Sequence, residues 1–152
     1  MNAIVAVNSD WGIGLDGKQQ NVVPEDRRHF RLLTEGGVVI VGRKTFESFP
    51  APLPRRVNII LTRNRDYLRD GALIAHSVGD VLAMIGGYDT GKVFVVGGES
   101  VYRQLMPYCA KAYVTKIELA PPSDTFFPNL DIMPDWTREL DAVSMETETG
   151  IR

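Results

Sequence analysis

Short apolar runs that end at glycine or at a polar turn constrain the fold of this chain most strongly. Ala3–Val7, Val38–Val41 and Val93–Val96 each hold four or five consecutive apolar residues. A strand that is buried on both faces has this pattern, because neither face needs polar side chains to meet water. Since segments of helical length separate such runs, the sequence predicts an α/β protein with one mixed, mainly parallel twisted sheet and flanking helices.

The remaining expected elements continue this alternation. A polar loop with three glycines spans Asn8–Asn21. Helices are expected from Pro24 to about Thr34 and over Lys44–Phe49, Val78–Ile85 and Ser100–Met106. Further strands are expected at Val57–Leu61, Ala72–Ala75, Tyr113–Ile117 and Trp136–Leu140. No repeat or linker interrupts the 152 residues, so we expect a single domain over residues 1–152.

Composition and charge narrow the classes of partner. The net charge of −2 gives no reason to expect a nucleic acid or an acidic membrane surface. Cys109 is the only cysteine, which excludes an internal disulfide and fits the reducing cytoplasm. The apolar start Met1–Val7 is short and lacks a basic flank, so a strand is expected there and not a signal peptide. His29 and His76 offer no metal-ligand spacing, so no metal is expected. We expect a monomer, since nothing in the sequence suggests an interface.

Two segments place glycine between a strand and the start of a helix. One contains Gly97-Gly98 followed by Glu99-Ser100, and the other is Gly42-Arg43-Lys44-Thr45. Glycine lets the backbone approach a pyrophosphate closely, and the free N–H groups of a helix start attract its charge. A tight turn between strand and helix would require the same glycines, so both interpretations stay open.

Cations follow two of the expected strands. Arg43 and Lys44 come after one strand, and Arg63 comes after the next. If these strands are parallel, the three side chains lie at one edge of the sheet, where open α/β sheets bind ligands. Such a cluster suits a 2′-phosphate and therefore favours NADPH over NADH. Ordinary solvated surface charge is the alternative for each residue taken separately.

Asp26 is the most notable acidic group. It lies in the first turn of the expected helix, where any carboxylate is favoured by the helix dipole. Phe30 follows four residues later and shares its helix face. A carboxylate beside an aromatic ring can serve an apolar pocket for a flat heterocycle, but the dipole alone would also explain Asp26.

Taken together, these segments resemble the dihydrofolate reductase family, in the bacterial chromosomal form, from Met1 to about Trp136. The motifs that carry the resemblance are Ala3-Ile4-Val5-Ala6 with Trp11-Gly12-Ile13-Gly14, Pro24-Glu25-Asp26 with Phe30, Gly42-Arg43-Lys44-Thr45 with Glu47-Ser48, Pro52-Leu53-Pro54 with Arg56-Val57-Asn58, Val96-Gly97-Gly98 with Tyr102, Thr115-Lys116-Ile117, and Asp124-Thr125-Phe126-Phe127-Pro128. Each motif alone is unspecific, but their common order makes chance agreement implausible.

The resemblance implies an oxidoreductase of one-carbon metabolism. It would reduce 7,8-dihydrofolate to 5,6,7,8-tetrahydrofolate, with hydride passing from the nicotinamide C4 of NADPH to the pterin C6. Asp26, supported by Thr115, would hold the pterin and promote protonation at N5. Antifolates such as trimethoprim or methotrexate would be its inhibitors.

The resemblance also implies two sets of binding residues. The substrate would contact Ile4, Val5, Asp26, Phe30, Phe49, Leu53, Arg56, Val96, Tyr102 and Thr115, with Arg56 pairing with the glutamyl α-carboxylate. NADPH would contact Ala6, Ile13, Gly14, Asp16, Gly17, Lys18, Gln19, Gly42, Arg43, Lys44, Thr45, Leu61, Thr62, Arg63, His76, Val96, Gly97, Gly98, Glu99, Ser100, Val101, Tyr102, Gln104 and Thr125.

Four positions depart from the family pattern. Asn21 stands where many members carry a tryptophan that orders an active-site water, and Gln19 replaces an apolar lid residue. Arg27 occupies a position where the family prefers an apolar contact to the benzoyl ring, so we expect it to turn outward. Glu99 stands where the family favours a small residue, and its charge is expected to point away from the pyrophosphate.

The end of the chain departs as well. The family continues past Gly150-Ile151-Arg152 with an antiparallel strand, and we expect this strand to be missing here, leaving an unpaired sheet edge near Tyr113–Ile117.

Two other functions stay open at this point. A pyrimidine reductase of riboflavin synthesis would share the fold and NADPH but not the acid of Asp26 or the Arg56 clamp. A catalytically weak folate- or NADPH-binding protein would fit the shortened end and Asn21.

Overall fold

Our computed structural model describes residues 1–8, 10–15, 18–19, 24–117, 123, 125–130, 133 and 136. At residues 8, 14–15, 18–19, 24–26 and 116–117 it describes the backbone alone.

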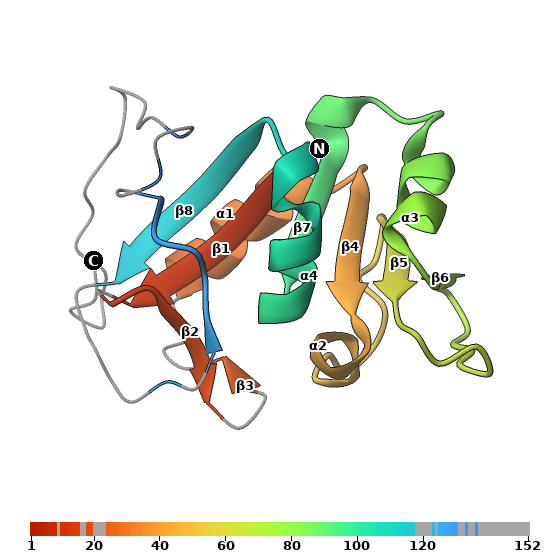
Figure 1. Cartoon of the computed structure of the whole chain (residues 1–152), viewed down its shortest axis with the longest axis horizontal. Coiled ribbons are helices and arrows are strands. Elements are labelled where there is room, and N and C mark those ends of the chain that lie inside the picture. Colours follow the sequence, from red (N-terminus) through yellow and green to blue (C-terminus); the bar gives the residue numbers. More distant parts are fainter. Residues whose placement is uncertain are drawn as a thin grey trace.

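A six-stranded parallel sheet forms the centre of the molecule (Figure 1). Its strands lie in the order β6 (Leu73–Ala75), β5 (Val57–Leu61), β4 (Val38–Gly42), β7 (Val93–Gly97), β1 (Asn2–Asn8) and β8 (Lys111–Ile117). All five pairings in it are parallel. The prediction of a mainly parallel α/β sheet is therefore confirmed. Because the strands run the same way, their carboxyl ends share one edge.

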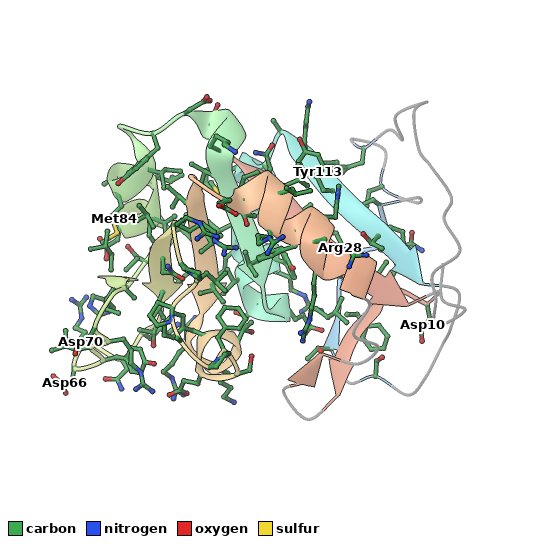
Figure 2. All side chains as sticks on the ribbon, turned by 180° about the vertical axis from the view of Figure 1, so that it is seen from behind. Asp10, Arg28, Asp66, Asp70, Met84 and Tyr113 are labelled. Atoms are coloured by element: carbon green, nitrogen blue, oxygen red, sulfur yellow. The ribbon has the colours of Figure 1, made fainter. Side chains whose placement is uncertain are left out.

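In the described part of the chain, four helices pack around this sheet: α1 (Pro24–Thr34), α2 (Arg43–Glu47), α3 (Val78–Ile85) and α4 (Glu99–Leu105). Short 3-10 turns lie at Thr90–Lys92 and Met106–Tyr108. Helix α1 crosses the face of the sheet that is seen in Figure 2, where Arg28 is labelled on it, and α4 lies on the opposite face (Figure 1). Within the described residues, no helix is apolar over a length that would cross a membrane.

The core explains why the apolar runs are continuous. Ile40 and Ile59 are fully buried in the larger cluster on one face, whereas Val41 and Ile60 pack with Phe46 of α2 on the other. Neighbouring residues of a strand point to opposite faces, so a strand with helices on both sides must be apolar at every position. Each fully buried Ile or Val of this kind stabilises the fold by roughly 1.5–3 kcal/mol.

A second, antiparallel sheet was not predicted. It consists of β3 (Lys18–Gln19), β2 (Gly12–Leu15) and β9 (Thr125–Phe126), in that order. The sequence predicted a loop over Asn8–Asn21, which is wrong for the two strands it contains. These strands are short and rich in glycine or polar residues, so their local pattern does not predict a strand. The partner that orders β2 is β9, more than 100 residues further along the chain.

Other boundaries also differ from the prediction, and α4 and β8 begin one and two residues earlier than expected. Helix α2 begins one residue earlier than expected and ends at Glu47, because the Ser48 N–H already donates to Thr45 O in a tight turn. Of the predicted strand Trp136–Leu140, only Trp136 is described, and its N–H donates to Met133 O, as in a turn. Residues 137–152, which bear on the expected missing strand, lie outside the described part of the chain.

Candidate functional site

A cavity of about 1150 Å³ opens at the carboxyl edge of the parallel sheet. Drug-sized ligands occupy pockets of roughly 300–1,000 Å³, so this cavity has room for more than one such molecule. Its lining comes from β1, from the ends of β4, β5 and β7, and from the loops and helices that follow them. The lining residues are Ile4, Val5, Ala6, Ile13, Arg27, Phe30, Gly42, Arg43, Lys44, Thr45, Ser48, Phe49, Pro50, Ala51, Pro52, Leu53, Pro54, Leu61, Thr62, Arg63, His76, Val96, Gly97, Gly98, Glu99, Ser100, Val101, Tyr102, Gln104 and Thr125.

One group of lining residues, which we call the cationic end, follows the strands β4, β5 and β6. Arg43 and Lys44 open α2, Arg63 follows β5, and His76 follows β6. The structure thus brings together basic side chains that lie between positions 43 and 76 of the sequence. His76 Nδ1 lies 3.0 Å from Thr62 O, and since a carbonyl only accepts, this ring nitrogen carries a hydrogen. The Nε2 atom is then the ring nitrogen left for a ligand.

Arg43 is held by a surface group that we call the Tyr67 stack: Arg43, Glu47, Tyr67 and Arg69. Its guanidinium lies 6.0 Å from the Tyr67 ring centre and 3.3 Å from Glu47 Oε1. Arg69 lies 5.6 Å from the same ring centre, donates to Tyr67 Oη at 2.9 Å and reaches Glu47 Oε2 at 3.4 Å. The stack fixes an otherwise flexible side chain at the rim of the cavity. Sequence analysis missed this role of Tyr67 and Arg69, because no local pattern links them to Arg43.

The glycines between strand and helix have a structural reason of their own. Gly97 has φ +143°, a conformation that side chains disfavour. A Cβ at Gly42 would lie 3.0 Å from Val101 Cγ2, and one at Gly98 would lie 3.2 Å from Thr45 Oγ1. Close packing of β4 and α2 against α4 therefore requires bare backbone at these points. The same bare backbone lines the cavity, so the tight-turn and ligand-binding interpretations are compatible.

The other group, the apolar end, is built from β1, α1 and the Pro50–Pro54 segment. Its apolar lining contains Ile4, Val5, Phe30, Phe49 and Leu53, all predicted from the sequence. Asn58, only 2% exposed, fixes the segment by donating to Leu53 O at 2.9 Å and accepting from Leu53 N at 3.0 Å. Pro52 and Pro54 belong to a motif that carried the resemblance, but neither they nor Pro50 were predicted as binding residues, and all three line the cavity.

Tyr102 joins the walls of the cavity. Its hydroxyl lies 2.7 Å from Ile4 O and 2.6 Å from Val96 O, so its one hydrogen is shared between carbonyls of β1 and β7. The ring is 2% exposed and packs edge-on against Phe127, with 4.8 Å between ring centres. Ile4 and Val96, which carry these carbonyls, both line the cavity, so the Tyr102 hydroxyl fixes two points of its wall.

Arg56, the predicted carboxylate clamp, lies beside the cavity and not in its lining. Its Nε donates to Pro54 O at 2.9 Å, and one terminal nitrogen donates to Thr34 Oγ1 at 3.1 Å. The guanidinium also lies 6.0 Å from the Phe30 ring centre. Burial lowers the pKa of Arg56, which Glu35 partly offsets. The group is therefore held in place beside the apolar end by three neighbours.

Asp26 and Thr115 belong to elements that border the apolar end. Asp26 is the third residue of α1, one turn before Phe30, and its side chain lies outside the described part. Thr115 of β8 pairs with Ala6 of β1, a lining residue. The side chains of Lys18 and Gln19 also lie outside the description, as do Asp16, Gly17 and Asn21 entirely, whereas Gly14 is described as part of β2.

Two of the departures from the expected pattern are described. Arg27 is exposed, as expected, but it still lines the cavity. Both carboxylate oxygens of Glu99 have partners: Oε2 accepts the Phe126 N–H at 2.6 Å, and Oε1 lies 3.5 Å from an Arg103 nitrogen.

Other reactive groups give no second site among the described residues. No cluster of His, Cys, Asp or Glu suited to a metal ion is found in the described part of the chain. Burial raises the pKa of the Cys109 thiol to about 11, so this thiol is a poor nucleophile at neutral pH.

Comparison with known proteins gives one consistent result. A family profile described as dihydrofolate reductase matches residues 1–149. The chain is 38% identical to the dihydrofolate reductase of Bacillus subtilis over 128 residues, which is 84% of this chain and 75% of that one. It is 40% identical to the enzyme of Neisseria meningitidis serogroup A over 129 residues, or 84% and 78% of the two chains. The solved structure of Enterococcus faecalis dihydrofolate reductase, complexed with NADP(H) and RAB-propyl, matches with a TM-score of 0.78 at 39% identity, covering 86% of this chain and 77% of that one.

Proposed function

The chain belongs to the dihydrofolate reductase family and is an oxidoreductase that reduces dihydrofolate with NADPH, and we propose that its cavity holds both molecules end to end, with Asp26 as the acid. The cationic end would bind the cofactor phosphates, and the apolar end would bind the pterin and benzoyl rings. The pyrimidine reductase of riboflavin synthesis has no support from the family match.

The residues of the cationic end suit NADPH. Arg43, Lys44 and Arg63 offer positive charge for a 2′-phosphate, and a guanidinium can bind a phosphate through two parallel hydrogen bonds. Gly42, Gly97 and Gly98 line the cavity without side chains, and the Thr45 hydroxyl lies beside Gly98, so a pyrophosphate would be able to approach the backbone there. When bound, NADPH supplies the hydride. The chain's own task is to orient the nicotinamide against the pterin and to exclude water from the space between them.

Asp26 is proposed as the group that promotes protonation of the pterin N5, because the described lining residues offer no other acid without a partner. Glu99 is the one carboxylate among the described lining residues, and both of its oxygens are engaged with Phe126 and Arg103. Asp26 shares a helix face with Phe30, a lining residue. A carboxylate on that face, supported by Thr115, would hold the amino and ring N–H groups of the pterin and raise the proton affinity of N5.

Arg56 is proposed to bind the glutamyl α-carboxylate of the substrate. The interactions with Thr34 and Pro54 use Nε and one terminal nitrogen and leave further donors on the guanidinium. Since the contacts hold the group in place before the substrate arrives, little entropy is lost when a carboxylate binds.

The cellular setting follows partly from the family. As a dihydrofolate reductase the protein serves one-carbon metabolism and is an antifolate target. We further propose that trimethoprim and methotrexate bind at the apolar end, and that the protein works in the cytoplasm as a monomer. The half-buried free thiol of Cys109 supports a reducing compartment. Light scattering of the purified chain tests the monomer.

The direct test of the proposal follows the loss of nicotinamide absorbance in a mixture of protein, NADPH and dihydrofolate. Absorbance should fall in the wild type, and the rate should drop sharply in Asp26→Asn. Binding of both ligands without any turnover in the wild type would instead identify a binding protein.

A further inference from the structure

Glu99 makes a contact that the family resemblance did not suggest. Its carboxylate oxygen accepts the backbone N–H of Phe126 at 2.6 Å, across 27 residues of sequence. Hydrogen bonds from N–H to a carboxylate at this distance are charge-assisted and roughly twice as strong as neutral ones. The side chain of Glu99 is 25% exposed, and the hydrogen bond lies at the surface of the molecule.

The contact joins two layers of the molecule. Glu99 opens α4, which packs on β7 of the main sheet, whereas Phe126 belongs to β9 of the small sheet. Successive N–H groups of a strand point to opposite edges. The Phe127 N–H donates to Trp11 O at 2.9 Å, on the side of β2, and the Phe126 N–H therefore faces the opposite edge, where Glu99 receives it. Without Glu99 this donor of an edge strand would lose its protein partner.

The small sheet carries part of the cavity wall. Thr125 of β9 and Ile13 of β2 both line the cavity, and β9 pairs with β2 at Gly12 and Gly14. Any movement of β9 away from α4 would therefore move two lining residues. Phe127 fixes the far end of β9 by stacking on Trp11 and meeting Tyr102 edge-on. The Glu99 carboxylate fixes β9 in the same way at Phe126, next to the glycines Gly97-Gly98 that line the cavity.

We propose that Glu99 is a positioning residue that holds β9, and through it the wall formed by Ile13 and Thr125, closed against the NADPH end of the cavity. The proposal rests on the NADPH site described above. A carboxylate in this place has two opposite effects. Its charge repels the phosphates of NADPH, while its hydrogen bond keeps the wall closed around them. Arg103, 3.5 Å from the other carboxylate oxygen, reduces the repulsion.

The variants Glu99→Gln and Glu99→Ala separate the two effects. Both remove the charge, but only the glutamine keeps an oxygen that can accept the Phe126 N–H. The ratio of their NADPH dissociation constants therefore isolates the hydrogen bond. We expect Glu99→Ala to bind NADPH about tenfold more weakly than Glu99→Gln, which corresponds to the upper part of the range for a single hydrogen bond. Arg103→Ala is the matched control and should change the constant by less than about twofold.

Hydrogen exchange of the ligand-free protein gives a readout that is independent of NADPH. The Phe126 amide should exchange at least about tenfold faster in Glu99→Ala than in Glu99→Gln, because only the alanine leaves it without an acceptor. If Glu99→Ala fails to fold, Glu99→Asn takes its place, since it is neutral like the glutamine but its shorter side chain cannot span the same distance. NADPH binding itself is measured by tryptophan fluorescence.

Faster Phe126 exchange together with the tenfold difference in NADPH binding would support the proposal. Equal dissociation constants for Glu99→Ala and Glu99→Gln would overturn it, as would unchanged exchange at Phe126. A wild type that binds no NADPH would instead contradict the proposed function, and the exchange data would show in the same protein whether the Glu99–Phe126 contact exists.

Discussion

The two ends of the cavity lie on one sheet edge but are built in opposite ways. The apolar end is walled by β1, α1 and a proline segment that a buried asparagine fixes. The cationic end consists of exposed or half-buried side chains in the first residues after three strands, held by surface contacts such as the Tyr67 stack. Salt screens surface charges strongly and buried contacts weakly. The difference indicates that shape determines binding at one end and charge at the other.

The largest effect is expected from the acid of the apolar end. Asp26→Asn should lower kcat/KM for dihydrofolate at neutral pH by about 10²–10⁴-fold, the usual contribution of a positioned acid or base. Activity should recover in part at lower pH, where the substrate takes its proton from solution. Stopped-flow absorbance over a pH series measures this. Near-full activity of Asp26→Asn at neutral pH would refute the role of Asp26.

The next largest effect is expected at Arg56. Arg56→Lys should raise KM for dihydrofolate about tenfold, because an ammonium cannot form the paired hydrogen bonds of a guanidinium with a carboxylate. The dissociation constant of NADPH should stay unchanged, which serves as the internal control for folding. An equal loss in both ligands would mean that Arg56 supports the fold through Thr34 and Pro54, and not the substrate.

A smaller, salt-dependent effect is expected at the cationic end. Arg63→Ser should raise the dissociation constant of NADPH about fivefold at low ionic strength and less at high ionic strength, since screening already weakens an exposed contact. NADH, which lacks the 2′-phosphate, should bind both proteins equally. Loss of NADH affinity as well would show that Arg63 acts elsewhere than on that phosphate.

The smallest effect is expected from the Tyr67 stack. Tyr67→Leu removes the ring under Arg43 and Arg69, and exposed cation–π contacts contribute only about 0.5–1 kcal/mol each. We expect a two- to fivefold rise in the NADPH dissociation constant, because Arg43 loses the cation–π contact that orients it toward the cofactor. Tyr67→Phe keeps the ring and should bind NADPH like the wild type. If Tyr67→Leu also binds NADPH with the wild-type dissociation constant, the stack does not orient Arg43.

Much of the main sheet could be predicted from the sequence, because buried parallel strands leave a local signal. Val38–Val41 and Val93–Val96 are apolar at every position because both faces of these strands are covered. The small sheet could not be predicted, since β2 and β9 are short and pair only when the whole chain folds. Its place beside the cavity is a consequence of tertiary contacts such as Phe127 against Trp11.

The site divides in the same way. Residues beside a strand end, such as Gly42, Arg43 and Arg63, could be placed in the cavity from the strand pattern alone. The supporting contacts could not, because they link distant residues with no shared periodicity. Arg56 with Thr34, and Glu99 with Phe126, are 22 and 27 residues apart. Asp26 stays a prediction from the motif, with its helix and its neighbour Phe30 in agreement.

Simultaneous binding of NADP⁺ and folate tests most directly whether one cavity has two chemically distinct ends. The two molecules are both oxidised and exchange no hydride, so the ternary complex is stable. Titrating folate into protein saturated with NADP⁺, at low and high salt, should show binding without displacement. Salt should weaken NADP⁺ markedly and folate little. Competition between the two ligands, or an equal response of both to salt, would contradict the account.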